Sequence, residues 1–185
     1  MIEKEMKFLI GKVDFERVLK RAHELYPQAQ VKVIEQANYY YDTPDLFLFN
    51  HRTTLRVRKI GEKYLVQKKS DKSYENGIRT AKETEKEIDC LPESFSSAEV
   101  GIQGEYEFKQ LGGLFTKRTR FILHDGTKLD FDVSRYFGVE DYELEIELEG
   151  DLPAELLLEL SVRSGVFKGK YQRFLERFRM EMDGQ

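Results

Sequence analysis

Several stretches of this chain alternate apolar with charged residues, and within most of them the charges share one sign. Residues 55–58 are Leu-Arg-Val-Arg, residues 129–133 are Leu-Asp-Phe-Asp-Val and residues 143–147 are Glu-Leu-Glu-Ile-Glu. In a β-strand this spacing puts every charge on one face and every apolar side chain on the other. Solvated protein faces usually mix their charges, because blocks of like charge repel one another. The pattern therefore predicts a sheet whose charged face binds anions and metal ions together.

The remaining pattern predicts enough strands to close that sheet. We expect strands at residues 2–10, 31–41, 53–59, 64–69, 80–89, 114–124, 127–134 and 141–149. We expect helices from Asp14 to about residue 25, in part of residues 92–110 up to Gly112-Gly113, from Pro153 to residue 162 and over residues 170–182, and a mobile loop or lid at residues 70–79. Eight strands joined by short connections form a barrel wide enough to hold one small ligand. The predicted fold class is α+β: a single domain, residues 1–185, built as an eight-stranded antiparallel closed β-barrel with flanking helices.

Composition restricts the functions that such a barrel can serve. The net charge of −4 argues against a general nucleic-acid binder, which would normally be basic. Cys90 is the single cysteine, so an intrachain disulfide and a cysteine-based zinc site are excluded. No apolar run approaches the length of a membrane span. We therefore expect a cytoplasmic protein that binds a small molecule and no membrane; the oligomeric state, a homodimer included, stays open.

The charged faces provide two sets of candidate ligands. Arginine forks match phosphate oxygens, and lysine acts as a compact point charge; the basic candidates are Arg56, Arg58, Lys68, Arg118 and Arg120. Carboxylates two residues apart on a strand repel unless a hard cation lies between them, and oxygen ligands suit Mg²⁺ or Mn²⁺. The acidic candidates are Glu3, Glu5, Glu85, Glu87, Asp130, Asp132, Glu143, Glu145 and Glu147. Any one of these strands taken alone is better explained as a solvated face; their co-occurrence in one sheet favours a charged lumen.

With these residues assembled, the chain resembles the CYTH superfamily, the triphosphate tunnel metalloenzymes. Glu3-Lys4-Glu5-Met6-Lys7 matches the family's Glu-x-Glu-x-Lys, and Leu55-Arg56-Val57-Arg58 matches its Leu-Arg-x-Arg strand. The other matching segments are Tyr40 to Asp45, Leu65 to Lys68, Thr116 to Arg118, Asp130 to Asp132, Glu145 to Glu147 and Lys170. Lys168 and Lys170 flank Gly169, and either matches the family's tunnel lysine. Asn38 stands where several relatives carry an acid.

The resemblance implies a site as well as a barrel whose lumen is a charged tunnel. It implies polyphosphate binding by Lys7, Arg56, Arg58, Lys68, Arg118 and Lys170, to which Arg120 is added, and metal binding by Glu3, Glu5, Glu87, Asp130, Asp132, Glu145 and Glu147. The catalytic residues would be Glu5, Lys7, Arg56, Arg58, Lys68 and Arg118.

The expected activity is the Mg²⁺- or Mn²⁺-dependent hydrolysis of a triphosphate, either inorganic tripolyphosphate or a small organic triphosphate. Two alternatives use the same charges. A class IV-type adenylate cyclase would convert ATP to cyclic AMP and pyrophosphate, and it would need a nucleoside pocket at one tunnel mouth. A non-catalytic polyphosphate or nucleotide binder would lack a placed water. Product analysis with tripolyphosphate, ATP and thiamine triphosphate separates the three.

Overall fold

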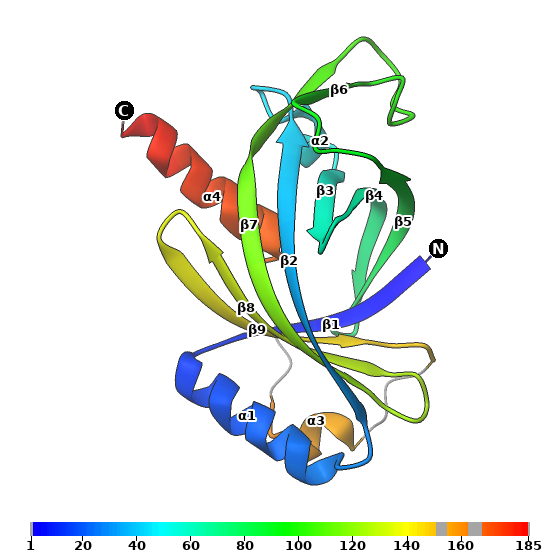
Figure 1. Cartoon of the computed structure of the whole chain (residues 1–185), viewed down its shortest axis with the longest axis vertical. Coiled ribbons are helices and arrows are strands. Elements are labelled where there is room, and N and C mark those ends of the chain that lie inside the picture. The colour runs from blue at the N-terminus through cyan, green and yellow to red at the C-terminus, as the bar shows by residue number, and fades with distance from the viewer. Residues whose placement is uncertain (1, 151–154, 163–167, 185) are drawn as a thin grey trace.

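The fold is a closed antiparallel β-barrel, seen in a computed structural model that describes residues 2–150, 155–162 and 168–184 (Figure 1). In sheet order the barrel strands are β2 (Gln30–Asp42), β3 (Thr54–Ile60), β4 (Lys63–Glu75), β5 (Ile78–Ile88), β1 (Ile2–Ile10), β9 (Val139–Glu147), β8 (Lys128–Tyr136) and β7 (Glu107–Ile122). Pairing of β2 with β7 along nearly their whole length closes the ring. The short strand β6 (Ser94–Ser96) adds to β7 outside the ring. The predicted eight-stranded α+β barrel is confirmed.

The alternation in sequence fixes which side chains face the interior. Arg56 and Glu145 line the internal cavity, as do Arg58 and Glu147 on the same strands. Their neighbours Leu55 and Val57 on β3, and Leu144 and Ile146 on β9, are buried in apolar clusters outside the barrel. The middle of the lumen is therefore charged, and two of the hydrophobic clusters lie outside the wall. One lies under α1, and the other lies under β6 and the turns that follow it.

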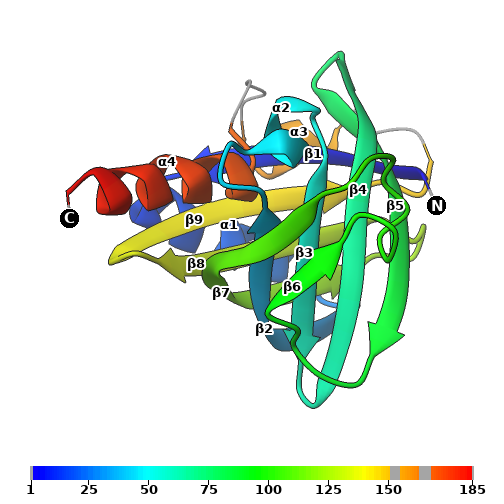
Figure 2. The same cartoon turned by 90° about the horizontal axis from the view of Figure 1, so that it is seen from above.

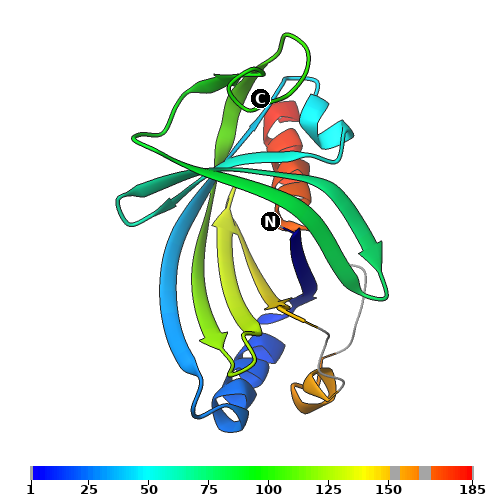
Figure 3. The same ribbon diagram turned by 90° about the vertical axis from the view of Figure 1, so that its right-hand side faces the viewer.

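Helices lie at both ends of the barrel, and α1 covers the outer apolar face at one of them (Figure 3). Helix α1 (Lys12–Leu25) presents Phe15, Val18 and Ala22 to the outer faces of β1, β9, β8 and β7, and α3 (Leu156–Glu159) joins the same cluster. Helix α4 (Lys170–Asp183) lies beside β8 and β9 at the other end (Figure 2). Its Phe174 packs against Tyr136, which shares the inward face of β8 with Asp130 and Asp132, so α4 fills this end of the barrel. None of the described helices is both long and apolar enough to cross a bilayer.

A buried carboxylate joins the helical cover to the barrel. Asp42, at the end of β2, accepts hydrogen bonds from the backbone N–H groups of Leu48 (2.8 Å) and Phe49 (3.0 Å) in α2 (Phe47–Asn50). It also accepts the hydroxyl proton of Tyr171 in α4 at 2.8 Å. Because a buried carboxylate is tolerated only when its oxygens are satisfied, Asp42 ties β2, α2 and α4 together.

Two sequence predictions about connections are wrong. Residues 70–79, expected to form a loop, extend the β4–β5 hairpin, whose turn is Asn76-Gly77 with φ values of 51° and 84°. Asn-Gly is a strong hairpin-turn sequence, and it outweighs the polar character of the segment. Residues 92–110 contain no helix; β6 and a series of turns occupy them, consistent with their Ser and Gly content.

Other boundaries differ in detail. Gly112 and Gly113 lie within β7 rather than closing a helix, and Gly112, at φ 144°, faces the ring of Phe174, which a Cβ would meet at 3.3 Å. Gly11, not Asp14, is the N-terminal cap of α1. The helix predicted from Pro153 begins in residues outside the described ones, and its described part is α3.

Truncating the outer core should be costly even though no charge is touched. Phe131 is 1% exposed and packs edge-on against Phe15 of α1 and Phe121 of β7. We expect Phe131→Ala to lower the free energy of unfolding by about 3–5 kcal/mol, from lost burial and the cavity left behind. Phe115→Ala, on the same outer wall but 55% exposed, should cost only about 0.5 kcal/mol. Equal losses in urea denaturation of the two variants would contradict this placement of the core.

Candidate functional site in the barrel lumen

The barrel encloses a cavity of about 1430 Å³, and every barrel strand contributes side chains to it. Most of the predicted site residues line this cavity: Glu3, Glu5, Lys7, Arg56, Arg58, Arg118, Arg120, Asp130, Glu145, Glu147 and Lys170. Asp132 lies beneath them, fully buried, and contacts two of them. Lys68 and Glu87 are not among the lining residues.

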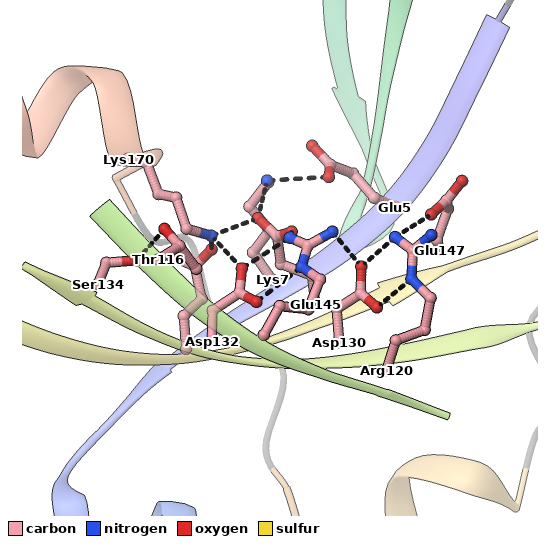
Figure 4. Close-up of polar contacts among 12 residues, drawn as sticks. Glu5, Lys7, Thr116, Arg120, Asp130, Asp132, Ser134, Glu145, Glu147 and Lys170 are labelled. Atoms are coloured by element: carbon pink, nitrogen blue, oxygen red, sulfur yellow. Dashed lines mark hydrogen bonds and ion pairs between the residues drawn. The ribbon is translucent and has the colours of Figure 1, made fainter. Parts of the chain in front are cut away.

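A buried lysine joins the carboxylates of the acidic strands (Figure 4). Lys170, the first residue of α4, lies within 2.8 Å of Asp132, 2.6 Å of Glu143 and 2.8 Å of Glu145 through its Nζ. Burial alone would lower the pKa of Lys170, but the three carboxylates outweigh burial and raise it. Lys168, the alternative tunnel lysine, is exposed and pairs with Glu176 at 2.8 Å. The structure therefore brings Lys170 into the lumen and leaves Lys168 outside.

Two arginines of β7 are held by the carboxylates directly opposite on β8. Arg118 is paired in register with Asp132 and donates to both of its carboxylate oxygens at 2.7 Å. Arg120 is likewise opposite Asp130 and donates to it at 2.7 and 2.6 Å. Such bidentate forks fix the orientation of the guanidinium as well as its position. Arg118 also reaches Glu145 on β9 at 2.6 Å, so it links three strands.

The pKa values of Glu145 and Glu143 are shifted in opposite directions, although both carboxylates contact Lys170. Burial raises the pKa of both, yet Lys170, Lys7 and Arg118 hold the pKa of Glu145 well below its usual range. Glu143 is buried more completely and lies beside Glu145, and its pKa is raised despite its contact with Lys170. Lys7 of β1 completes the cluster, 2.5 Å from Glu145 and 2.9 Å from Glu5.

The opposite wall, formed by β3, lacks this compensation. Arg58 donates through Nε to Asn38 at 3.0 Å and makes no ion pair with any described residue. Burial, then the neighbouring Arg56 and Arg118, lower the pKa of Arg58 to about 9. Arg56 donates to Gln67 at 2.7 Å, and its closest carboxylate, Glu83, is 3.9 Å away. Asn38, which is opposite Arg58 in the pairing of β2 with β3, is buried, and its Nδ2 has no partner among the described residues.

The lysine of β4 that faces the lumen is Lys69, not the predicted Lys68. The two-residue turn after Ile60 pairs Arg56 with Gln67 and Leu55 with Lys68, and cross-strand partners share a face. Lys68 therefore points outward, where its Nζ donates to the carbonyl of Val100 at 2.7 Å. Lys69 lines the cavity and forms ion pairs with Glu3 and, at 3.0 Å, with Glu83. The turn itself was recognisable from sequence, so counting outward from it would have identified Lys69.

On β5 the lumen ends before the predicted metal ligand Glu87. Glu83 and Glu85 line the cavity, and Glu85 accepts a hydrogen bond from Gln67 at 2.5 Å. Glu87 is exposed and pairs with Lys63 at 3.2 Å, near the hairpin turn between β3 and β4. The structure does not bring Glu87 to the other acidic residues.

The acidic wall has the donor chemistry of a site for a hard divalent cation. One carboxylate oxygen from each of Asp132, Glu143 and Glu145 lies within 4.8 Å of the others, and all-oxygen donors suit Mg²⁺ or Mn²⁺. The same three carboxylates all contact Lys170. A cation at their centre would thus have to replace the ammonium of Lys170. Glu3, Glu5 and Glu147 are among the other carboxylates that line the cavity, and they need no such exchange with Lys170.

Comparisons with known proteins agree with this architecture. The family model of the CYTH domain matches residues 1–165. No curated protein matches the chain. Among solved structures, a protein of Hippeastrum assigned as an adenylyl cyclase and found to have a dominant triphosphatase activity superposes with a TM-score of 0.73 at 22% identity, covering 94% of this chain and 95% of that one.

Two further structures are similar. A protein of Bacillus halodurans identified as a candidate adenylate cyclase gives a TM-score of 0.68 at 25% identity, covering 92% of this chain and 95% of that one. The capping-enzyme triphosphatase of Mimivirus gives 0.56 at 14% identity, covering 87% and 89%.

The buried cluster makes Lys170 necessary for stability. In Lys170→Met three buried carboxylates lose their shared cation, and we expect the free energy of unfolding to fall by about 3–5 kcal/mol at pH 7. The folded-state pKa values of these carboxylates would rise above their unfolded values. The deficit should then be full at neutral pH and shrink as the pH falls toward about 4, where the unfolded chain is also protonated.

The matched control is Lys168→Met, which removes an exposed pair and should cost no more than about 1 kcal/mol. Urea denaturation of both variants at pH 7 and pH 5 tests the prediction. A deficit for Lys170→Met that is the same at both pH values would count against it.

Proposed function

The chain belongs to the CYTH domain family, and from this premise we propose that it is a metal-dependent triphosphatase whose substrate lies in the barrel lumen. Members of the family are triphosphatases or cyclases. The proposed substrate is inorganic tripolyphosphate or a small organic triphosphate, and the reaction is hydrolysis of a phosphoric anhydride bond.

The observation that carries the proposal is the unequal compensation of the two walls. Each carboxylate of the acidic wall, on β8 and β9, contacts a cation, whereas Arg58 donates to the neutral Asn38 and has no ion pair among the described residues. An unpaired buried charge is unfavourable, and Arg58 is crowded further by Arg56 and Arg118. A polyanion lying against β3 would relieve this repulsion, and arginine forks match phosphate oxygens.

The proposed roles follow from the contacts of each side chain. Arg56, Arg58 and Arg118 would bind non-bridging oxygens and stabilise the charge that develops as the terminal phosphoryl group leaves. Lys69 replaces Lys68 as the phosphate ligand of β4, and Lys7 and Lys170 would exchange carboxylate partners for phosphate oxygens. Asp130 and Asp132 are already engaged by arginine forks, so we assign them the positioning of Arg118 and Arg120.

The metal ligands proposed are four carboxylates of β1 and β9 that line the cavity. Glu3, Glu5, Glu145 and Glu147 would hold Mg²⁺ or Mn²⁺. The bound cation supplies a Lewis acid that neutralises phosphate oxygens. Glu87 is left out of this set because it lies on the surface with Lys63.

One observation favours the cyclase alternative. Phe49 of α2 and Tyr171 of α4 line the cavity and contact each other edge-on, with ring centroids 6.0 Å apart. An aromatic pair at the helical end of the lumen could accept a nucleoside base. Cyclic AMP and pyrophosphate from ATP, in place of phosphate from tripolyphosphate, would establish that chemistry.

Removing Arg58 should weaken triphosphate binding without regard to the attached group. We expect Arg58→Ala to raise the dissociation constants of tripolyphosphate and ATP alike. The loss of binding free energy should be on the order of 1.5–3 kcal/mol for each ligand, the contribution of a charged hydrogen bond. Lys59→Ala, the adjacent outward-facing residue, should leave both unchanged. Calorimetry with Mg²⁺ present makes the comparison; a wild-type preference for ATP over tripolyphosphate of more than about tenfold would indicate a base pocket and favour the cyclase.

Removing a proposed metal ligand should separate activity from stability. Glu5→Gln should abolish phosphate release from tripolyphosphate, while the melting temperature with chelator present stays equal to that of the wild type or rises. The fold tolerates the change because Lys7 keeps Glu145 as a partner. Glu62→Gln, in the exposed turn between β3 and β4, is the control. Full turnover by Glu5→Gln, or by the wild type in excess chelator, would rule out metal-assisted chemistry at this residue.

A further inference from the structure

A bulge in β4 turns one more lysine into the lumen. Ser70 pairs with Lys82, but Ser73 pairs with Thr80, so two residues of β4, Asp71 and Lys72, oppose a single residue of β5. Asp71 has φ 50°, in the left-handed region that non-glycine residues seldom adopt. β-Bulges of this kind re-aim a side chain and occur next to active sites.

The extra residue changes the face to which Lys72 belongs. In an unbroken strand Lys72 would share the outward face of Lys68, because side chains alternate and a shift of one residue exchanges the faces. With the bulge, Lys72 lines the same cavity as Lys69 and Arg56. The bulge that directs Lys72 into the barrel therefore requires Asp71 to adopt an unfavourable backbone conformation.

Lys72 is surrounded mainly by other cations. Its Nζ donates to the hydroxyl of Thr54 on β3 at 2.6 Å, and it has no ion pair with any described carboxylate. Burial first, then Lys69 on its own strand, Arg56 on β3 and Lys7 on β1, lower the pKa of Lys72 to about 8; Glu5 on β1 opposes them weakly.

On the neighbouring strand β5, Glu83 and Arg79 have other partners than Lys72. On β5, Glu83 forms ion pairs with Lys69 and Arg56. Arg79, which also lines the cavity, has its guanidinium 6.0 Å from the centre of the Tyr74 ring. Lys72 thus resembles Arg58 in having no ion pair with a described carboxylate.

The cations form a continuous row. Thr54, Arg56 and Arg58 follow one another on the inward face of β3, and Lys72 donates to Thr54, so Lys72, Arg56 and Arg58 lie in order along this wall. Arg118 is a further cationic neighbour of Arg58. We propose that Lys72 is a substrate-binding residue that contacts a phosphoryl group beyond those reached by Arg118, Arg58 and Arg56, and so makes the site selective for chains of at least three phosphates. This inference rests on the proposed function and adds to it a basis for selecting substrate length.

The test compares ligands of different length on matched variants. Lys72→Met should weaken tripolyphosphate binding about tenfold or more at pH 7 and pyrophosphate binding less than about twofold, measured by calorimetry with Mg²⁺ present. Lys72→Arg keeps the charge and should stay within about threefold of the wild type for both ligands. Lys82→Met, exposed on the outer face of β5, should change neither affinity.

Proton uptake gives a second readout on the folded wild type. A bound phosphate stabilises the charged form of Lys72, so its pKa in the complex rises above the value of about 8 in the free protein. Binding at pH 8 should take up a fraction of a proton, and affinity should fall as the pH rises from 7 to 9. Calorimetry in buffers of different ionisation enthalpy measures this uptake. The wild type should take up more than Lys72→Met, and the Met variant also corrects for protons bound by tripolyphosphate itself.

Each outcome is decisive. If the wild type binds tripolyphosphate and Lys72→Met binds it equally, with equal proton uptake, the role of Lys72 is wrong and the proposed function stands. If Lys72→Met loses affinity for pyrophosphate and tripolyphosphate to the same extent, Lys72 contributes general charge and does not select length, which overturns the inference. If the wild type binds neither ligand, the proposed function fails and this inference fails with it.

Discussion

The interaction on which the rest of this structure depends is the contact of Lys170 with Asp132, Glu143 and Glu145. Three carboxylates buried side by side on β8 and β9 are unfavourable without cations beside them, and Lys170 contacts all three. The cation comes from α4, so docking of the C-terminal helix and the charge state of the lumen are linked. The buried Asp42, which accepts hydrogen bonds from both α2 and Tyr171 of α4, holds the same helix at its other contact.

The charged lumen also explains why the core around Phe131 and Leu144 lies outside the barrel. Side chains of a strand alternate between two faces, and the inward positions of these strands are mostly charged. Phe131 and Leu144 must then be covered from outside, which α1 does. Helix α1 is therefore required by the tunnel, because without it this apolar face would be exposed to water. Helix α4 has another role: its Phe174 packs on the inward-facing Tyr136 and fills one end of the barrel.

The sequence predicts which side chains of a strand share a face, but it predicts less well how neighbouring strands are aligned with one another. Alternation alone places Arg56, Arg58, Glu145 and Glu147 in the lumen. It fails for Lys68, because two adjacent lysines satisfy any local pattern and only the register from the turn after Ile60 distinguishes them. It fails for Glu87 because alternation does not say where along a strand the lumen ends. The inward position of Lys72 depends on a bulge, which is a property of two strands together and leaves no pattern in either one.

The two walls of the lumen have different roles because their charges are balanced differently. Glu145 is held by Lys7, Arg118 and Lys170, so its contacts already stabilise the folded chain. Among the described residues, Arg58 and Lys72 donate to neutral partners, Asn38 and Thr54, and the crowding of these cations opposes folding. Selection for stability alone would replace such cations by neutral residues or supply them with carboxylates. Their presence in a strained strand is best explained by a ligand that carries the missing negative charge, so that the acidic wall supports the fold and the basic wall supports binding.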